Sequence, residues 1–481
     1  MPPTFFDEMI TDGTVRAPYQ PVQDWLQMMG PEALLHNQKI AEELFRRAGI
    51  TFQVYGQGGD PERLIPFDVV PRVFALDEWS RLEAGVLQRA RALNAFLRDI
   101  YNEQAILREG IIPKELVLNN EAFEPVMVGF LPPHNIYSHI IGTDIVRTGP
   151  NEFFVLEDNC RVPSGVSYML ETRDAMVRLF PELFARNRVM PVNDYPDALL
   201  WTMKSIAGAG ALDDPSVAVL TPGHFNSAYY EHSYLADEMG IPLVEGPDLL
   251  VEDNRVYYRT TRGRQQVDVI YRRVDDAFLD PKVFRPDSML GVPGLIEAYL
   301  NGGITLANAP GTGVADDKAI YSYVPEMIRF YLSEEPLLPN VETYRCANKA
   351  ELSHVLENME ELVVKEVHGS GGYGMLIGPK ATKDEVATFR EKVKANPGDY
   401  IAQPTLSLST CPTLVAEGVA PRHVDLRPFC LTGRETMHMT KGGLTRVALP
   451  EGSLVVNSSQ GGGVKDTWVL DSDGATQGAP S

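Results

Sequence analysis

The side chains of Asp144, Glu157 and Asn159 together have the composition of a site for a hard divalent metal. Glu157 and Asn159 stand two positions apart at the end of an apolar run that predicts a strand, so both side chains point to one face. The turn residues 148–151 predict a hairpin, which would bring Asp144 beside Glu157. Two carboxylates and an amide, without Cys or His, favour Mg²⁺ or Mn²⁺ held against phosphates over zinc. The alternative is a solvated acidic hairpin in an acidic protein.

A lysine and a glycine-rich loop later in the chain could bind those phosphates. Lys365 ends the apolar run 362–364, and the glycines after it follow a GxGxxG pattern. A dinucleotide-binding turn requires a helix directly after the glycines, whereas residues 375–377 predict a short strand that stops at Gly378. In protein kinases the lysine follows the loop, and here it precedes the loop. The pattern predicts a lysine that reaches phosphates from a strand while loop N–H groups close over them, with a plain glycine hairpin as the alternative. The loop residues are Gly369, Ser370, Gly371, Gly372, Tyr373 and Gly374.

Together these motifs resemble the ATP-grasp superfamily, and more closely its circularly permuted branch, which is related to glutathionylspermidine synthase. In ordinary ATP-grasp enzymes the lysine and glycine flap precede a Glu-x-Asn metal strand, whereas here Glu157 precedes Lys365. The resemblance extends from about residue 60 to about residue 470. It implies an α/β (α+β) class, with an ATP-grasp fold in permuted order and an inserted Rossmann-like pre-ATP-grasp domain. It also implies ATP and Mg²⁺ (or Mn²⁺) as cofactors.

The resemblance assigns nucleotide-binding residues by their place in the family's motifs. Lys318, which follows two aspartates, matches the first nucleotide lysine, and Lys365 matches the second. The strand 400–404, which contains Gln403, resembles the hinge whose backbone reads the adenine edge. Asp425 resembles the first residue of an Asp-x-Arg strand that lines the site.

One departure from the family concerns a cation. In glutathionylspermidine synthase an arginine lies two residues before the metal-binding aspartate, and this chain has Gly142 there. An acyl phosphate carries negative charge that the metal alone does not cover, so a second positive group is expected near the γ-phosphate. We predict Arg446 as this catalytic group, with Arg427 of the Asp-x-Arg strand as the alternative. The other arginines that could take the role are Arg147 and Arg161. Glutathione and spermidine are therefore not carried over as substrates.

Composition narrows the class of protein. With 481 residues, 44% of them hydrophobic, the chain can bury a large core and should contain two or three domains. A net charge of −22 argues against a nucleic-acid partner. No apolar run approaches the roughly 18 residues of a membrane span, and no signal peptide is recognised. Four scattered cysteines indicate neither a disulfide framework nor a zinc site. We therefore expect a cytoplasmic enzyme.

Changes in the pattern of apolar, glycine and polar residues divide the chain into four expected parts. Apolar spacing predicts helices over 81–101 and about 172–184. Strand and helix signals between 217 and 271 predict a βαβ unit, and the glycine pattern there does not match the dinucleotide fingerprint, so NAD is not assigned. The expected parts are a metal-binding half over 1–200, a Rossmann-like substrate domain over 201–305, a lysine and glycine-flap half over 306–470, and a flexible tail over 471–481.

The predicted activity is the ATP-dependent ligation of a carboxylate to an amine through an acyl phosphate. The expected partners are a small-molecule or peptide carboxylate and an amine. Two alternatives stay open: a phosphotransferase that passes phosphate to an acceptor and stops, and a nucleotide-binding module without turnover. The sequence leaves the substrates and the oligomeric state open.

Overall fold

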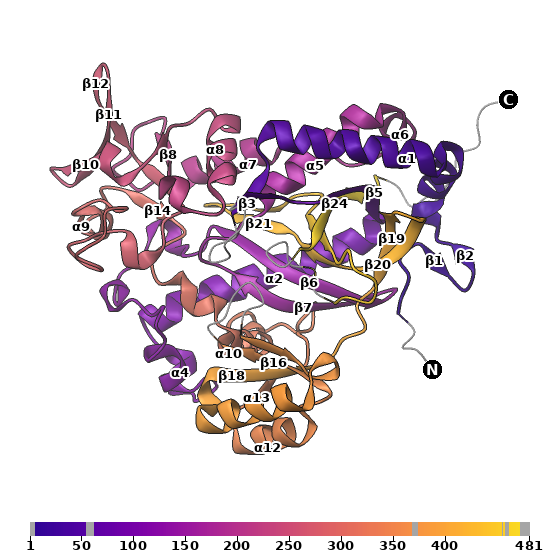
Figure 1. Cartoon of the computed structure of the whole chain (residues 1–481). Coiled ribbons are helices and arrows are strands. Elements are labelled where there is room, and N and C mark those ends of the chain that lie inside the picture. The colour runs from indigo at the N-terminus through magenta and orange to yellow at the C-terminus, as the bar shows by residue number, and fades with distance from the viewer. Residues whose placement is uncertain (1–4, 54–61, 368–373, 455, 457–460, 472–481) are drawn as a thin grey trace.

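The computed structural model describes residues 5–53, 62–367, 374–454, 456 and 461–471. Within these ranges the chain forms a mixed α/β fold around one nine-stranded sheet and several smaller sheets (Figure 1). The predicted α/β (α+β) class is confirmed. The α-helices are α1 (Gln20–Ala48), α2 (Leu76–Tyr101), α3 (Ala105–Arg108), α4 (Lys114–Leu118), α5 (Val166–Leu179), α6 (Pro181–Arg186), α7 (Tyr195–Ser205), α8 (Tyr229–Glu238), α9 (Leu295–Leu300), α10 (Lys318–Tyr321), α11 (Val324–Met327), α12 (Lys349–Asn358) and α13 (Lys383–Ala395).

The nine-stranded sheet combines strands from the two ends of the chain. Its order is β22-β21-β6-β20-β23-β24-β5, with β7 paired to β6 and β19 paired to β20. The pairs are antiparallel except for β24 and β5, which are parallel. The strands are β5 (Phe67–Phe74), β6 (Ile140–Gly149), β7 (Glu152–Asn159), β19 (Thr410–Val415), β20 (Gly418–Arg427), β21 (Phe429–Thr432), β22 (Met437–Met439), β23 (Leu444–Val447) and β24 (Gly463–Val469).

Helices cover both faces of this sheet (Figure 1). Successive residues of a strand point to opposite faces, and accordingly Ile140 packs in the same core cluster as side chains of α1 and α5, while Ile141 packs in the cluster that contains α2. The predicted helix over 81–101 is confirmed as the C-terminal part of α2. The helix predicted over 172–184 is instead two helices, α5 and α6, because Pro181 starts the second one and disfavours helical geometry at the residue before it.

A four-stranded parallel sheet lies in the middle of the sequence. Its order is β14-β13-β8-β9, and α8 joins β8 to β9 in the predicted βαβ arrangement. The strands are β8 (Val217–Leu220), β9 (Leu243–Val244), β13 (Val269–Arg272) and β14 (Thr305–Ala307). A three-stranded antiparallel sheet is inserted before β13, formed by β10 (Leu249–Glu252), β11 (Arg255–Thr260) and β12 (Gly263–Val267). The assignment of this region as a Rossmann-like substrate domain, and the predicted domain boundaries, stay predictions.

A second four-stranded sheet, antiparallel throughout, has the order β15-β18-β16-β17 and packs with α12 and α13. In Figure 1 it lies below the large sheet, on the side of β7. Its strands are β15 (Tyr344–Arg345), β16 (Leu362–Glu366), β17 (Met375–Ile377) and β18 (Tyr400–Pro404). The other strands form short pairs: β1 (Ile10–Thr11) with β2 (Thr14–Val15), and β3 (Thr51–Gln53) with β4 (Glu62–Leu64). None of the helices in the described ranges is long and apolar enough to cross a bilayer.

Candidate active site

The predicted hairpin is formed by β6 and β7. The strands pair antiparallel, with Asp144 opposite Glu157 and Gly142 opposite Asn159. Residues directly opposite each other in such a pair share a face, so the three predicted metal ligands lie side by side. The Asn159 amide nitrogen donates to the Gly142 carbonyl at 3.2 Å, which leaves the amide oxygen as the atom able to bind a cation. The structure therefore brings these three residues together as the hairpin prediction required.

The opposite face of the hairpin fixes its register. Asp158 and Arg89 of α2 are fully buried, and the Arg89 Nε donates to the Asp158 carboxylate at 3.2 Å. The Thr143 hydroxyl donates to the same carboxylate at 3.2 Å. A slip of one residue would exchange the two faces of the strand and remove this buried charge from its partner. The neighbours of the predicted ligands thus hold Glu157 on the other face.

Two arginines converge on Asp144 from neighbouring strands. Arg427, the last residue of β20, donates to both carboxylate oxygens, with Nη2 at 2.8 Å from Oδ2. Arg446 of β23 donates to the same Oδ2 at 2.7 Å and also pairs with Asp425, which lies opposite it on β20. The Arg427 Nη2 lies 3.8 Å from Glu157 Oε1. Burial alone would raise the pKa of Asp144, but the charges and hydrogen bonds of both guanidiniums outweigh it and hold that pKa well below its usual range.

Two lysines from outside the nine-stranded sheet, Lys318 and Lys365, also lie near Glu157 of the hairpin. The Nζ of Lys318, the first residue of α10, lies 3.7 Å from Glu157 Oε2. Lys365 of β16 donates to the side-chain oxygen of Gln403 on the adjacent strand β18 at 2.7 Å. Burial and the charge of Lys318 lower the pKa of Lys365 to about 8, although Glu157 and Asp144 act in the opposite direction. The two predicted nucleotide lysines and the predicted metal strand therefore face one point.

The strands that flank the glycine loop have the predicted geometry. β16 and β17 pair antiparallel, with Lys365 opposite Met375, and β17 occupies the position directly after the glycines where a dinucleotide site would need a helix. Gly374 has a φ of +68°, and its missing side chain leaves room for the carboxylate of Glu366. Residues Gly369, Ser370, Gly371, Gly372 and Tyr373 lie outside the described residues, so their predicted phosphate contacts stay predictions.

The space beside Gly142, where a side chain would lie, is filled by neighbouring residues. A Cβ built on Gly142 would lie 3.1 Å from Cβ of Pro163 and 3.3 Å from Cδ of Arg427. The aliphatic part of Arg427 therefore occupies the space into which a longer side chain at position 142 would extend. A guanidinium stands beside Asp144 even though position 142 carries no cation.

The other two candidate arginines have different surroundings. Arg147 is completely buried and donates to Glu78 and to the carbonyls of Gly149 and Pro150. Arg161 lies 3.4 Å from Asp275 and 3.7 Å from Asp316. Only Arg427 and Arg446 among the four donate to Asp144 in the described part of the chain.

The donor set fits a hard divalent cation. Across the described ranges no three His, Cys, Asp or Glu side chains gather as a metal site, so a metal here would be held by the mixed set of Asp144, Glu157 and Asn159. Carboxylate and amide oxygens are ligands that Mg²⁺ and Mn²⁺ accept.

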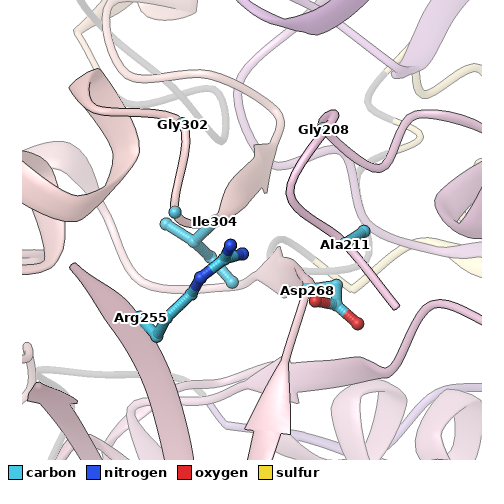
Figure 2. A pocket seen from close by; sticks show the side chains of 7 residues that line it. Gly208, Ala211, Arg255, Asp268, Gly302 and Ile304 are labelled. Carbon is cyan, nitrogen blue, oxygen red and sulfur yellow. The ribbon is translucent and has the colours of Figure 1, made fainter. Parts of the chain in front are cut away.

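A shallow surface depression lies elsewhere, lined by the loop before β8, by Arg255 at the start of β11 and by the residues just before β13 and β14 (Figure 2). Arg255 extends into it and donates to the carbonyl of Gly210. Asp268 accepts hydrogen bonds from the Ser216 N–H at 2.9 Å and the Gln266 amide at 2.6 Å. Both charged side chains of this depression, Arg255 and Asp268, are thus hydrogen-bonded to other parts of the protein. None of the predicted site residues lines the depression.

Comparison with known families agrees with this geometry. A family model described as circularly permuted ATP-grasp type 2 matches residues 71–448. The chain belongs to this circularly permuted ATP-grasp family. The resemblance that the inverted order of Glu157 and Lys365 indicated is therefore confirmed.

Several relatives align over nearly the whole chain. An uncharacterized protein of Synechocystis sp. is 52% identical over 99% of this chain and 98% of its own length. A putative glutamate–cysteine ligase of Frankia casuarinae is 43% identical over 97% of this chain, which spans 54% of that longer protein. Among solved structures, a glutathione synthetase-like effector from Globodera pallida aligns with a TM-score of 0.58 at 14% identity, over 92% of this chain and 98% of that one. This last similarity concerns the fold alone.

Sequence reasoning missed Ser164, in the segment after the metal strand, and two residues that contact this segment, Glu231 and Arg273. The available signal was the pair Arg272-Arg273 at the end of a buried strand, where two charges would otherwise be unexpected. Arg272 pairs with Asp276 four residues later, whereas Arg273 donates to the Pro163 carbonyl 110 residues away, a contact that no local pattern in the sequence indicates.

Proposed function

We propose that this chain is a Mg-ATP-dependent carboxylate–amine ligase that forms an amide bond through an acyl phosphate. The observation that carries the proposal is the convergence, around Asp144 and Glu157, of two lysines and two arginines from four separate segments. A group of cations beside two carboxylates and an amide suits a metal-bound polyphosphate. The name of the Frankia relative, a putative glutamate–cysteine ligase, supports amide formation as the reaction.

The reaction proceeds in two displacements. A carboxylate oxygen of the first substrate attacks the γ-phosphorus of ATP, and the bond from that phosphorus to ADP breaks. The amine nitrogen of the second substrate then attacks the acyl carbon, the carbon–oxygen bond to phosphate breaks, and the amine loses a proton. The products are an amide, ADP and phosphate.

The chain's own residues supply electrostatics and positioning. Bound at Asp144, Glu157 and Asn159, Mg²⁺ would reduce the phosphate charge that opposes attack. Lys318 and Lys365 would hold the phosphates of ATP in place. Arg427 and Arg446, fixed by Asp144, would stabilise the charge that develops on the transferred phosphoryl group. The Arg427 side chain beside Gly142 and Asp144 supports its role as the cation that position 142 does not provide.

An isotope experiment tests the proposal. Carboxylic acids labelled with ¹⁸O, including amino acids and short peptides, are paired with amines and incubated with Mg-ATP, and released phosphate is analysed by ³¹P NMR. A ligase that acts through an acyl phosphate transfers one ¹⁸O from the carboxylate to phosphate and produces an amide. A phosphorylated acceptor without amide would establish a phosphotransferase instead. ATP binding without ADP formation across the whole panel would favour a binding module.

A further inference from the structure

A buried ion pair links the parallel-sheet region to the segment that follows the metal strand. Arg273 directly follows β13, and Glu231 is in the first turn of α8. Their side chains are only 2% and 1% exposed, and Arg273 Nη2 lies 3.2 Å from Glu231 Oε1. A buried ion pair is by itself weak evidence for stability, because apolar residues of the same volume often serve as well. The contacts of this pair indicate a more specific role.

Both members of the pair hold the turn 163–167. The Arg273 Nη1 donates to the Pro163 carbonyl at 2.8 Å, and Nη2 donates to the Ser164 hydroxyl at 3.0 Å. The Glu231 carboxylate accepts the Gly165 N–H at 2.7 Å and both the N–H and hydroxyl of Ser167, at 3.1 and 3.0 Å. The turn is thus fixed from one side by five hydrogen bonds to two buried charges, which are stronger than bonds between neutral groups.

The other side of the same turn contacts the candidate active site. The Ser164 carbonyl accepts a hydrogen bond from Arg427 Nη1 at 3.2 Å. Pro163 and the aliphatic part of Arg427 both lie next to the space that a side chain at Gly142 would occupy. The guanidinium of Arg427 is planar, so its contacts with Asp144 on one edge and with Ser164 on another together fix its plane. A displaced turn would remove one of these two constraints.

We propose that Arg273 and Glu231 are positioning residues, which hold the 163–167 turn so that the Ser164 carbonyl orients Arg427 for phosphoryl transfer. The catalytic side of this inference rests on the proposed function, whereas the coupling between Arg273 and Arg427 does not. Through this contact, the parallel-sheet region would determine the orientation of a cation in the site. Partners that orient groups at a metal site typically change affinity or activity by about 10- to 100-fold when they are altered.

The test is a double-mutant cycle between positions 273 and 427. Arg273→Lys keeps the positive charge beside Glu231 but cannot donate to the Pro163 carbonyl and the Ser164 hydroxyl as the planar fork does. It is combined with Arg427→Lys, and the four proteins are compared for Mn²⁺ affinity by electron paramagnetic resonance and for ADP release. Arg173→Lys is the matched control, because Arg173 is also a buried arginine that pairs with a carboxylate, Asp466, and donates to two backbone carbonyls, those of Met190 and Thr467.

We expect Arg273→Lys to change Mn²⁺ affinity or ADP release by about tenfold in the otherwise unaltered protein, and by less than about twofold when Arg427→Lys is already present. Hydrogen exchange of the 160–167 peptide should accelerate in Arg273→Lys and stay unchanged in Arg173→Lys. Ser164→Ala, a milder change, should show part of the same effect and serves if Arg273→Lys does not fold.

Equal effects of Arg273→Lys with and without Arg427→Lys would overturn the inference and leave a purely structural ion pair. The Mn²⁺ cycle and the hydrogen exchange require no turnover. A protein that releases no ADP with any substrate pair would therefore reject the proposed function while the coupling between Arg273 and Arg427 is still decided.

Discussion

The two sides of the site come from different sheets and differ in how their charges are paired. On the nine-stranded sheet, Asp144 accepts hydrogen bonds from Arg427 and Arg446 at 2.8 and 2.7 Å between Nη2 and Oδ2. On the four-stranded antiparallel sheet, Lys365 donates to a neutral partner, Gln403, and burial lowers its pKa to about 8. One side presents cations already fixed by carboxylates, and the other presents a cation in surroundings that disfavour its charge.

This difference predicts that the two sides of the site affect different steps of the reaction. Cations held rigidly by carboxylates need little reorganisation when charge develops in a transition state, so they act mainly on the rate of the chemical step. A desolvated lysine gains most when an anion arrives and compensates its lost hydration. We therefore expect changes on the large sheet to lower turnover, and changes on the lysine side to weaken nucleotide binding.

The largest effect should come from Glu157→Gln. An amide is a poorer Mg²⁺ ligand than a carboxylate, so turnover should fall by roughly a hundredfold or more while the ATP affinity measured without metal is kept. The measurement is ADP release against Mg²⁺ concentration. Glu152→Gln, at the other end of the same strand, is the control. Unchanged metal dependence in Glu157→Gln would remove Glu157 from the site.

Arg427→Lys and Arg446→Lys should follow in size. Lysine keeps the charge but cannot form the forked contact with Asp144, so turnover should fall by roughly a hundredfold at saturating ATP, with a small change in the KM for ATP. Arg422→Lys on the same strand β20 is the control. A raised KM with normal turnover would assign these arginines to binding and would erase the proposed difference between the two sides.

Lys365→Ala should show the reverse pattern. Loss of one charged contact to phosphate should raise the Kd for Mg-ATP by about 10- to 100-fold. Because the charge of Lys365 is already disfavoured by burial, Tm without nucleotide should not fall. Calorimetric titration of Mg-ATP checks the affinity, with Lys394→Ala on the surface of α13 as control. A clear loss of Tm with unaltered affinity would mean that Lys365 has a structural role only.

The smallest expected effect lies outside both sides of the site. Burial and the nearby Asp276 raise the pKa of Glu124 from its usual 4.5 to about 7. The folded protein therefore retains this proton where the unfolded chain loses it, and stability should decrease as pH rises from about 4.5 to about 7. Glu124→Gln should raise Tm above pH 7 and leave it unchanged below pH 4.5, relative to Glu121→Gln at an exposed neighbouring position. Equal Tm changes at every pH would assign the effect to packing.

The parts of the site that the sequence predicted are those with local signals. The alternation of Glu157 and Asn159 and the turn before β7 were sufficient to place Asp144 opposite Glu157. The order of the strand, the lysine and the glycine loop distinguished the fold from other nucleotide-binding folds. These features depend on neighbouring residues, and local periodicity predicts them well.

The parts that the sequence did not predict depend on distant contacts. The start of α5 was missed because its N-terminal N–H groups are accepted by Glu231 of another helix, so no local capping residue marks the helix. The reason for Gly142 was also inaccessible, because the side chain that fills the adjacent space belongs to Arg427. Pairings across several hundred residues leave no periodic pattern in the sequence.

The separation of partners along the chain has a consequence for biosynthesis. Asp144 is 283 residues from Arg427 and 302 residues from Arg446, and at 5–20 residues per second a ribosome needs about 15 to 60 s to cover that interval. During this time β6 lacks β20 and β21, and β5 lacks β24, so the nascent chain carries open strand edges of the kind that aggregate. We therefore expect chaperone contact with the emerging strands β5 and β6, and a site that forms only after Arg446 has been synthesised.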